Sequence, residues 1–179
     1  HRLSWKILGL AAEDGDKAAT LTASSNGTEL TSGGSYAANT PVDFTLTLHG
    51  SYDLVSWSEN VTPAAGGRSA ELKLAADTEV TVTVEKKPVV VIERTANGTI
   101  EVRGKKNSKP VTITSTDYVD PGTNLTVTIK PDAGYVVNNP DEAWTAVDNS
   151  DNHTYTIHNV RADQTLSAGF AALDQHAIS

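Results

Sequence analysis

The chain has 179 residues, a formal net charge of −8 and a composition that is 38% hydrophobic and 20% charged, which is typical of a globular protein. The negative charge repels phosphate backbones and argues against a nucleic-acid partner, and the absence of cysteine excludes disulfides and thiolate metal sites. No stretch approaches the roughly 20 apolar residues of a membrane helix, so we expect no membrane span in this segment.

In the first half of the chain, apolar and polar residues alternate over several short segments. A period of two is typical of half-buried β-strands, and the Asn26-Gly27 pair between two segments suits a tight hairpin turn. No long helical period is present. The predicted strands are Leu3–Ile7, Thr20–Ala23, Glu29–Thr31, Val42–Leu48, Asp53–Trp57, Ala70–Leu74 and Glu79–Val84.

The second half of the chain shows the same alternation, with turn signals at "ANGT", "KNSK" and "DPGT". The basic stretch "RGKKNSK" is read as a charged hairpin tip. The predicted strands are Val89–Ile92, Thr99–Arg103, Val111–Thr114, Asn124–Ile129, Tyr135–Val137, Thr154–Ile157 and Gln164–Phe170.

The two halves match each other in order. Val42, Phe44 and Leu46 match Leu125, Val127 and Ile129, Leu21 matches Ile100, and Asp77 matches Asp163. The offset between matched residues rises steadily along the chain, as small insertions between related strands would produce. The sequence therefore predicts an all-β protein of two tandem, small β-sandwich-like or β-grasp-like modules of about 85 residues. The predicted boundaries are 1–87 for the first module, 88–171 for the second, and 172–179 for a polar tail.

Copy one carries "GSYDLVSW" and "AADTEVTVTV", and copy two carries "DPGTNLTVTIKPDAGY" and "VRADQTLSAGF". The order of these motifs resembles the divergent internalin-B B-repeats over nearly the whole chain. The resemblance implies spacer or adhesion modules that occur in tandem in secreted and cell-surface proteins of bacteria, without common catalytic residues. Copy two departs from the pattern because it has no Trp five residues after Tyr135, and Trp144 instead lies in an insert.

Motifs for catalysis or metal binding are lacking. The histidines form no HExxH pattern, "DNSDNH" lacks the glycine and the glutamate of a calcium loop, and no GxSxG or phosphate loop occurs. We therefore predict a protein that is not an enzyme, with no catalytic residues, no metal site and no cofactor.

The aromatic residues are the remaining candidates. Phe44, Tyr52, Tyr135 and Phe170 are expected to pack in or at the edge of the cores, with Phe44 and Val127 at equivalent positions, and Trp5 is expected in the core as well. The candidate ligand-binding residues are Trp144, Trp57, Asp141 and Glu142.

Trp144 is flanked by acidic and amide side chains, the combination of a stacking face and hydrogen-bonding groups that a sugar ring needs. The alternative is that Trp144 packs in place of the missing Trp of copy two. Trp57 occupies the position of the family's Trp and can pack over the sandwich edge.

These observations predict a non-catalytic extracellular repeat module, a monomer that acts as a spacer or interaction segment of a larger bacterial surface or secreted protein. The alternative is a carbohydrate-binding module appended to a glycan-active enzyme. In either case the expected partner is a cell-surface or extracellular glycan or protein. A binding module needs an exposed aromatic platform or a cleft with convergent polar groups, whereas a spacer needs neither.

Overall fold

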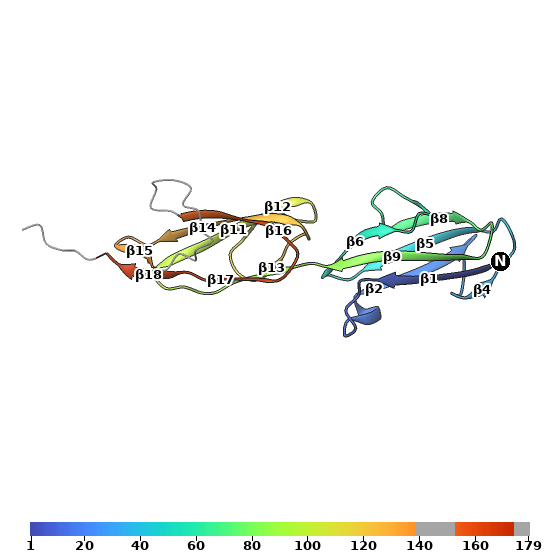
Figure 1. Cartoon of the computed structure of the whole chain (residues 1–179), viewed down its shortest axis with the longest axis horizontal. Helices are drawn as coiled ribbons and strands as arrows, with labels where there is room; N and C mark the ends of the chain where they lie inside the picture. The colour runs from blue at the N-terminus through green and yellow to red at the C-terminus, as the bar shows by residue number, and fades with distance from the viewer. Residues whose placement is uncertain (139–152, 174–179) are drawn as a thin grey trace, which may run out of the picture. The chain divides into compact units, whose positions relative to one another are not determined.

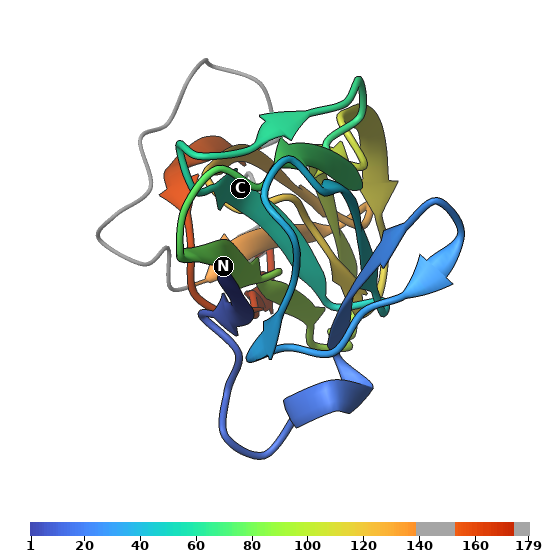
Figure 2. The same cartoon turned by 90° about the vertical axis from the view of Figure 1, so that its right-hand side faces the viewer.

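The computed structural model describes residues 1–138 and 153–173 (Figure 1). It is nearly all β, which confirms the predicted class, and the chain divides into two compact units, His1–Lys86 and Lys87–Ser179, here called module one and module two. The helical structure among the described residues is a 3₁₀ turn, η1 (Gly15–Lys17), in the connection that projects from module one (Figure 2).

Module one consists of two sheets. The first has the order β4-β1-β9-β6 and the second the order β3-β2-β5-β8-β7. In the first sheet, the first and last long strands of the module, β1 and β9, pair in parallel. The strands are β1 (Arg2–Leu8), β2 (Ala19–Ser25), β3 (Thr28–Glu29), β4 (Gly34–Ser35), β5 (Pro41–Leu48), β6 (Tyr52–Trp57), β7 (Thr62–Pro63), β8 (Ser69–Lys73) and β9 (Thr78–Lys86).

The core of module one lies between these sheets. Strand β5 alternates between buried and exposed residues along most of its length, because side chains on a strand point to opposite faces in turn. Its buried face, Val42, Phe44 and Leu46, packs with side chains of the other sheet that include Leu3 and Val82. The predicted alternation is therefore confirmed at the central strand.

Module two repeats this arrangement. One sheet has the order β12-β11-β14-β16, another has the order β13-β10-β17 with β10 and β17 parallel, and β15 pairs with β18. The strands are β10 (Val89–Ile92), β11 (Gly98–Lys106), β12 (Lys109–Ile113), β13 (Asp117–Tyr118), β14 (Thr123–Pro131), β15 (Tyr135–Asn138), β16 (His153–Val160), β17 (Gln164–Leu166) and β18 (Gly169–Ala172).

The pairing registers establish which residues of the two modules are equivalent. Leu46 faces Leu21 as Ile129 faces Ile100, and Phe44 and Val127 are both fully buried, as predicted. The predicted strand Gln164–Phe170 is divided in the structure into β17 and β18, whereas its counterpart β9 is continuous and pairs with both β1 and β6. The predicted strand Glu29–Thr31 also differs, because β3 ends at Glu29.

The matched aspartates hold the same position in the two modules. The Asp77 carboxylate accepts the backbone N–H of Arg2 at 2.8 Å, and the Asp163 carboxylate accepts that of Val89 at 2.8 Å. Each aspartate lies just before the last strands of its module and holds the start of the first strand. The repeat of Asp77 and Asp163 in the sequence thus reflects a repeated link between the beginning and the end of each module.

Candidate functional site

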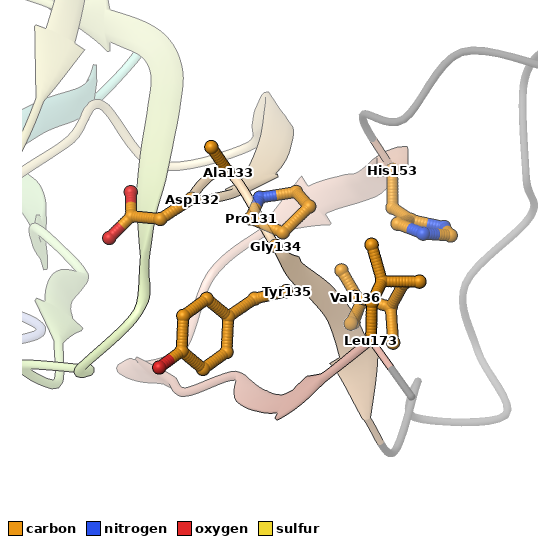
Figure 3. Close-up of a pocket in the computed structure, with 9 residues that line it drawn as sticks. Pro131, Asp132, Ala133, Gly134, Tyr135, Val136, His153 and Leu173 are labelled. Carbon is orange, nitrogen blue, oxygen red and sulfur yellow. The ribbon is translucent and has the colours of Figure 1, made fainter. Parts of the chain in front are cut away.

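A hollow of about 320 Å³ lies in module two around the turn that joins β14 to β15 (Figure 3). The sequence of this turn, "PDAGY", fixes its shape. Gly134 has a φ of +85°, which costs glycine little, and the Tyr135 N–H donates to the Asp132 carbonyl at 3.0 Å. The Leu173 N–H, after β18, donates to the Gly134 carbonyl at 2.8 Å, so that two segments distant in sequence meet at the hollow.

The side chains around the hollow form two groups. Figure 3 shows Tyr135 and Asp132 on one side of the turn, and His153 beside Val136 and Leu173 on the other. Val136 and Leu173 are 41% and 53% exposed, so the second group is an apolar surface with one imidazole. Because the carboxylate and the imidazole do not converge, this arrangement suits ligand contact better than proton transfer.

Three of the residues singled out from the sequence belong to the segment that joins β15 to β16. Trp144, Asp141 and Glu142 fall in residues 139–152, which lie outside the described residues. The hollow borders the ends of this segment in the chain, because Val137 and His153 line it.

Trp57 ends β6 and is half-buried in module one. Its Nε1–H donates to the Gly67 carbonyl at 2.7 Å, and its ring centroid lies 6.4 Å from that of Phe44. The polar edge and part of the ring are thus engaged within the module, which favours the packing interpretation of Trp57 over a stacking platform.

A polar cluster of module one contains Tyr52, Asp14 and Lys86. The buried Tyr52 hydroxyl donates to the Asp14 carboxylate at 2.7 Å and accepts the Ala11 N–H at 3.0 Å, and Lys86 Nζ lies 3.1 Å from the same carboxylate. Hydrogen bonds from Tyr52 and then from Lys86 lower the pKa of Asp14, while burial raises the pKa of Tyr52. The carboxylate is a poor base and the phenol a poor acid, so the cluster serves to fix the loop onto the sheet.

The matched tyrosines Tyr52 and Tyr135 differ in how far the connection after the first strand covers them. Residues 9–18 connect β1 to β2 and cover Tyr52, whereas only residues 93–97 connect β10 to β11. The matched Tyr135 is half-buried and lines the hollow. The shorter connection in copy two was the available signal that Tyr135 is less covered than Tyr52.

Among residues 1–138 and 153–173, no group of three or more His, Asp or Glu side chains could hold a metal ion. No helix in this part of the chain is long and apolar enough to cross a membrane.

The repeated fold defines the chain as a tandem β-module protein, in which the first strand of each module pairs in parallel with a strand near the end of that module. The family model of the divergent InlB B-repeat domain matches residues 18–97 and 88–174, and the chain belongs to this family. The resemblance seen in the sequence is thereby confirmed. The family is a non-catalytic module type associated with bacterial surface or extracellular proteins. No curated protein matches the chain.

Proposed function

We propose that the chain is a non-catalytic, extracellular spacer or interaction segment of a larger bacterial surface or secreted protein. Family membership supports this class of function. The observation that carries the spacer role is the parallel pairing of each module's first strand with a strand near its end, β1 with β9 and β10 with β17.

The parallel pairing of these strands gives each module resistance to tension. The chain enters each module at the start of β1 or β10. It leaves module one at the end of β9, and module two beyond β17, through β18. A pull on both ends therefore loads the hydrogen bonds of the parallel ladder together, in shear. The ladder joins residues 3–8 to residues 78–83 in module one, but only residues 90–92 to residues 164–166 in module two. More hydrogen bonds must break together in module one, so its barrier to unfolding under load should be higher. Because forced unfolding is governed by that barrier, module one is expected to withstand the higher force.

Single-molecule force spectroscopy tests this role. The chain has no cysteine, so cysteines added at its two ends provide specific handles, and two unfolding events are expected, the stronger from module one. In the control, Lys17→Cys with His49→Cys pulls β2 from β5 at their paired ends, which breaks the ladder one bond at a time and should need less force. Equal unfolding forces in both geometries would refute the proposed role of the parallel ladder in resisting tension.

The second candidate is carbohydrate binding by module two. The half-buried Tyr135 ring and Asp132 in the hollow support this candidate. Trp144, Asp141 and Glu142 belong to the segment that connects two of its lining residues, Val137 and His153, in the chain. A glycan array probed with the whole chain and with Trp144→Ala and Tyr135→Ala chains tests it. A glycan signal that both substitutions abolish, at an unchanged melting temperature, would support a sugar site, and the absence of any signal would reject it.

A further inference from the structure

A second and larger hollow, of about 710 Å³, lies in module two between the end of β10 and the edge of β11. Its volume is within the range of small-ligand sites. Its lining includes Ile92, Thr95, Ile100, Thr114 and Ser115; we call this hollow the β10–β11 groove.

Module one holds a tryptophan at the equivalent place. Trp5 lies opposite Val80 on the parallel ladder of module one, and Ile92 lies opposite Leu166 on that of module two. Both residues lie on the first strand of their module, after the residue whose backbone N–H binds the matched aspartate. The Trp5 ring packs edge-on against Phe44 with centroids 5.8 Å apart.

The polar groups around Trp5 also have counterparts in the groove. Trp5 Nε1–H donates to the Leu21 carbonyl at 3.1 Å, and the Trp5 backbone N–H donates to Ser32 Oγ at 2.9 Å. By the pairing registers, Leu21 corresponds to Ile100 and Ser32 to Ser115, and both of these residues line the groove.

The edge of β11 presents backbone groups to this groove. Strand β12 pairs with β11 only from Val102 to Lys106, so residues 98–101 have no described strand on that side. The Gly98 carbonyl, which accepts the Thr95 hydroxyl at 3.4 Å, points to this edge. Since carbonyls alternate along a strand, the Ile100 carbonyl points the same way, as its counterpart Leu21 does toward Trp5.

We propose that the β10–β11 groove binds a planar aromatic side chain that carries a hydrogen-bond donor, an indole or a phenol, presented by an extended segment of a partner protein. The ring lies against Ile92, and its N–H or O–H donates to the Ile100 carbonyl. Ser115, which also lines the groove, offers a hydroxyl to a polar group of the partner beside the ring. The inference deepens the proposed interaction role by naming the partner's chemistry.

The probe for this site is N-acetyl-tryptophanamide, titrated into the ¹⁵N-labelled whole chain and followed by NMR. Saturable shifts are expected at the amides of Ile92, Thr99, Ile100, Thr114 and Ser115. N-acetyl-leucinamide, which lacks both ring and donor, is the control ligand. Equal shifts with both ligands, or no saturable shifts at these amides, would overturn the proposal without any variant having to fold.

Ile92→Trp tests the same site from inside, because it places in module two the residue that module one already holds. The variant is expected to fill the groove, weaken binding of the probe at least about tenfold and raise the melting temperature of module two. Ile92→Val leaves the groove open and should keep binding. Unchanged binding in a folded Ile92→Trp chain would refute the site. Force spectroscopy does not depend on the groove, so a failed spacer role and a failed groove are distinguishable.

Discussion

Phe44 of module one and Tyr155 of module two are the large aromatic side chains of equivalent core layers, but they lie on different strands of the repeated sheet. Phe44 lies on β5, whereas Tyr155 lies on β16, the strand that pairs with β14, the counterpart of β5. Phe44 faces the small Ala70 across the strand pair in module one, whereas Val127, the counterpart of Phe44, faces Tyr155 in module two. All four side chains are buried. In module one the large residue of the pair is on the central strand, and in module two it is on the neighbouring strand. Each pair combines one large and one smaller side chain, which is consistent with close packing of a layer of similar volume.

This exchange predicts coupled effects on stability. Phe44→Val leaves a cavity and should lower the free energy of unfolding of module one by about 2–4 kcal/mol, somewhat less than a change of a buried Phe to Ala. Ala70→Phe alone should overpack the layer and cost about 1–3 kcal/mol. The double variant reproduces the layout of module two, and urea unfolding should show that its cost is less than the sum of the two. Additive costs would mean that the two positions do not share one layer.

Much of this core could be predicted from the sequence, because alternation and the matched order of two copies constrain each other. The alternation places Val42, Phe44 and Leu46 on the buried face of their strand. The matched order places Leu125, Val127 and Ile129 on the buried face in copy two, and all six side chains are buried. The partner of each strand was not predictable, since a period of two is the same for parallel and antiparallel ladders. The pairing of β1 with β9 depends on contacts between opposite ends of a module.

The candidate sites were less predictable because they arise from differences between the copies. The repeat identifies positions that match, such as Tyr52 and Tyr135, but it does not identify the residues that cover them in the fold. The β10–β11 groove depends on Ile92 standing where Trp5 stands in module one. That substitution is visible in the sequence only after the first strands of the modules are aligned through the hydrogen bonds of Asp77 and Asp163.

Acid should weaken module one through Asp14. Hydrogen bonds from Tyr52 and Lys86 lower the pKa of Asp14 from 3.8. A carboxyl with a lower pKa in the folded state adds stability above its unfolded pKa and loses that contribution as the pH falls through the folded pKa. The urea midpoint of module one should therefore decrease below about pH 4. An Asp14→Asn chain should show a smaller decrease, and an identical acid profile would contradict the assignment.

The same cluster should weaken module one in alkali. The hydrogen bond and charge of Asp14 raise the pKa of Lys86 from 10.5, and burial raises that of Tyr52 from 10.0. Both groups are stabilised in their protonated forms, so their contribution is present below the unfolded pKa values and is lost as the pH rises through the folded ones. The expected result is a fall in the urea midpoint above about pH 10 that Asp14→Asn reduces.

Substitutions of Trp57 separate packing from ligand binding. Trp57→Phe keeps a ring beside Phe44 but removes the hydrogen bond to the Gly67 carbonyl, and should cost about 1 kcal/mol. Trp57→Ala also removes the ring and should cost about 3 kcal/mol, the lower end for an aromatic truncation because the residue is half-buried. Thermal unfolding measures both. A loss of glycan binding with unchanged stability would instead make Trp57 a ligand residue.

Gly98 should resist substitution because the Phe170 ring lies over it. A Cβ on Gly98 would lie 2.2 Å from Phe170 Cζ, so Gly98→Ala should lower the free energy of unfolding of module two by about 1–3 kcal/mol. Module one has Ala19 and Val84 at the matched positions, and both are buried. Gly98→Ala combined with Phe170→Val should therefore cost less than Gly98→Ala alone, as followed by urea unfolding. A double variant less stable than Gly98→Ala alone would contradict this expectation. It would show that the packing lost with the Phe170 ring outweighs the relief of its overlap with the new Cβ.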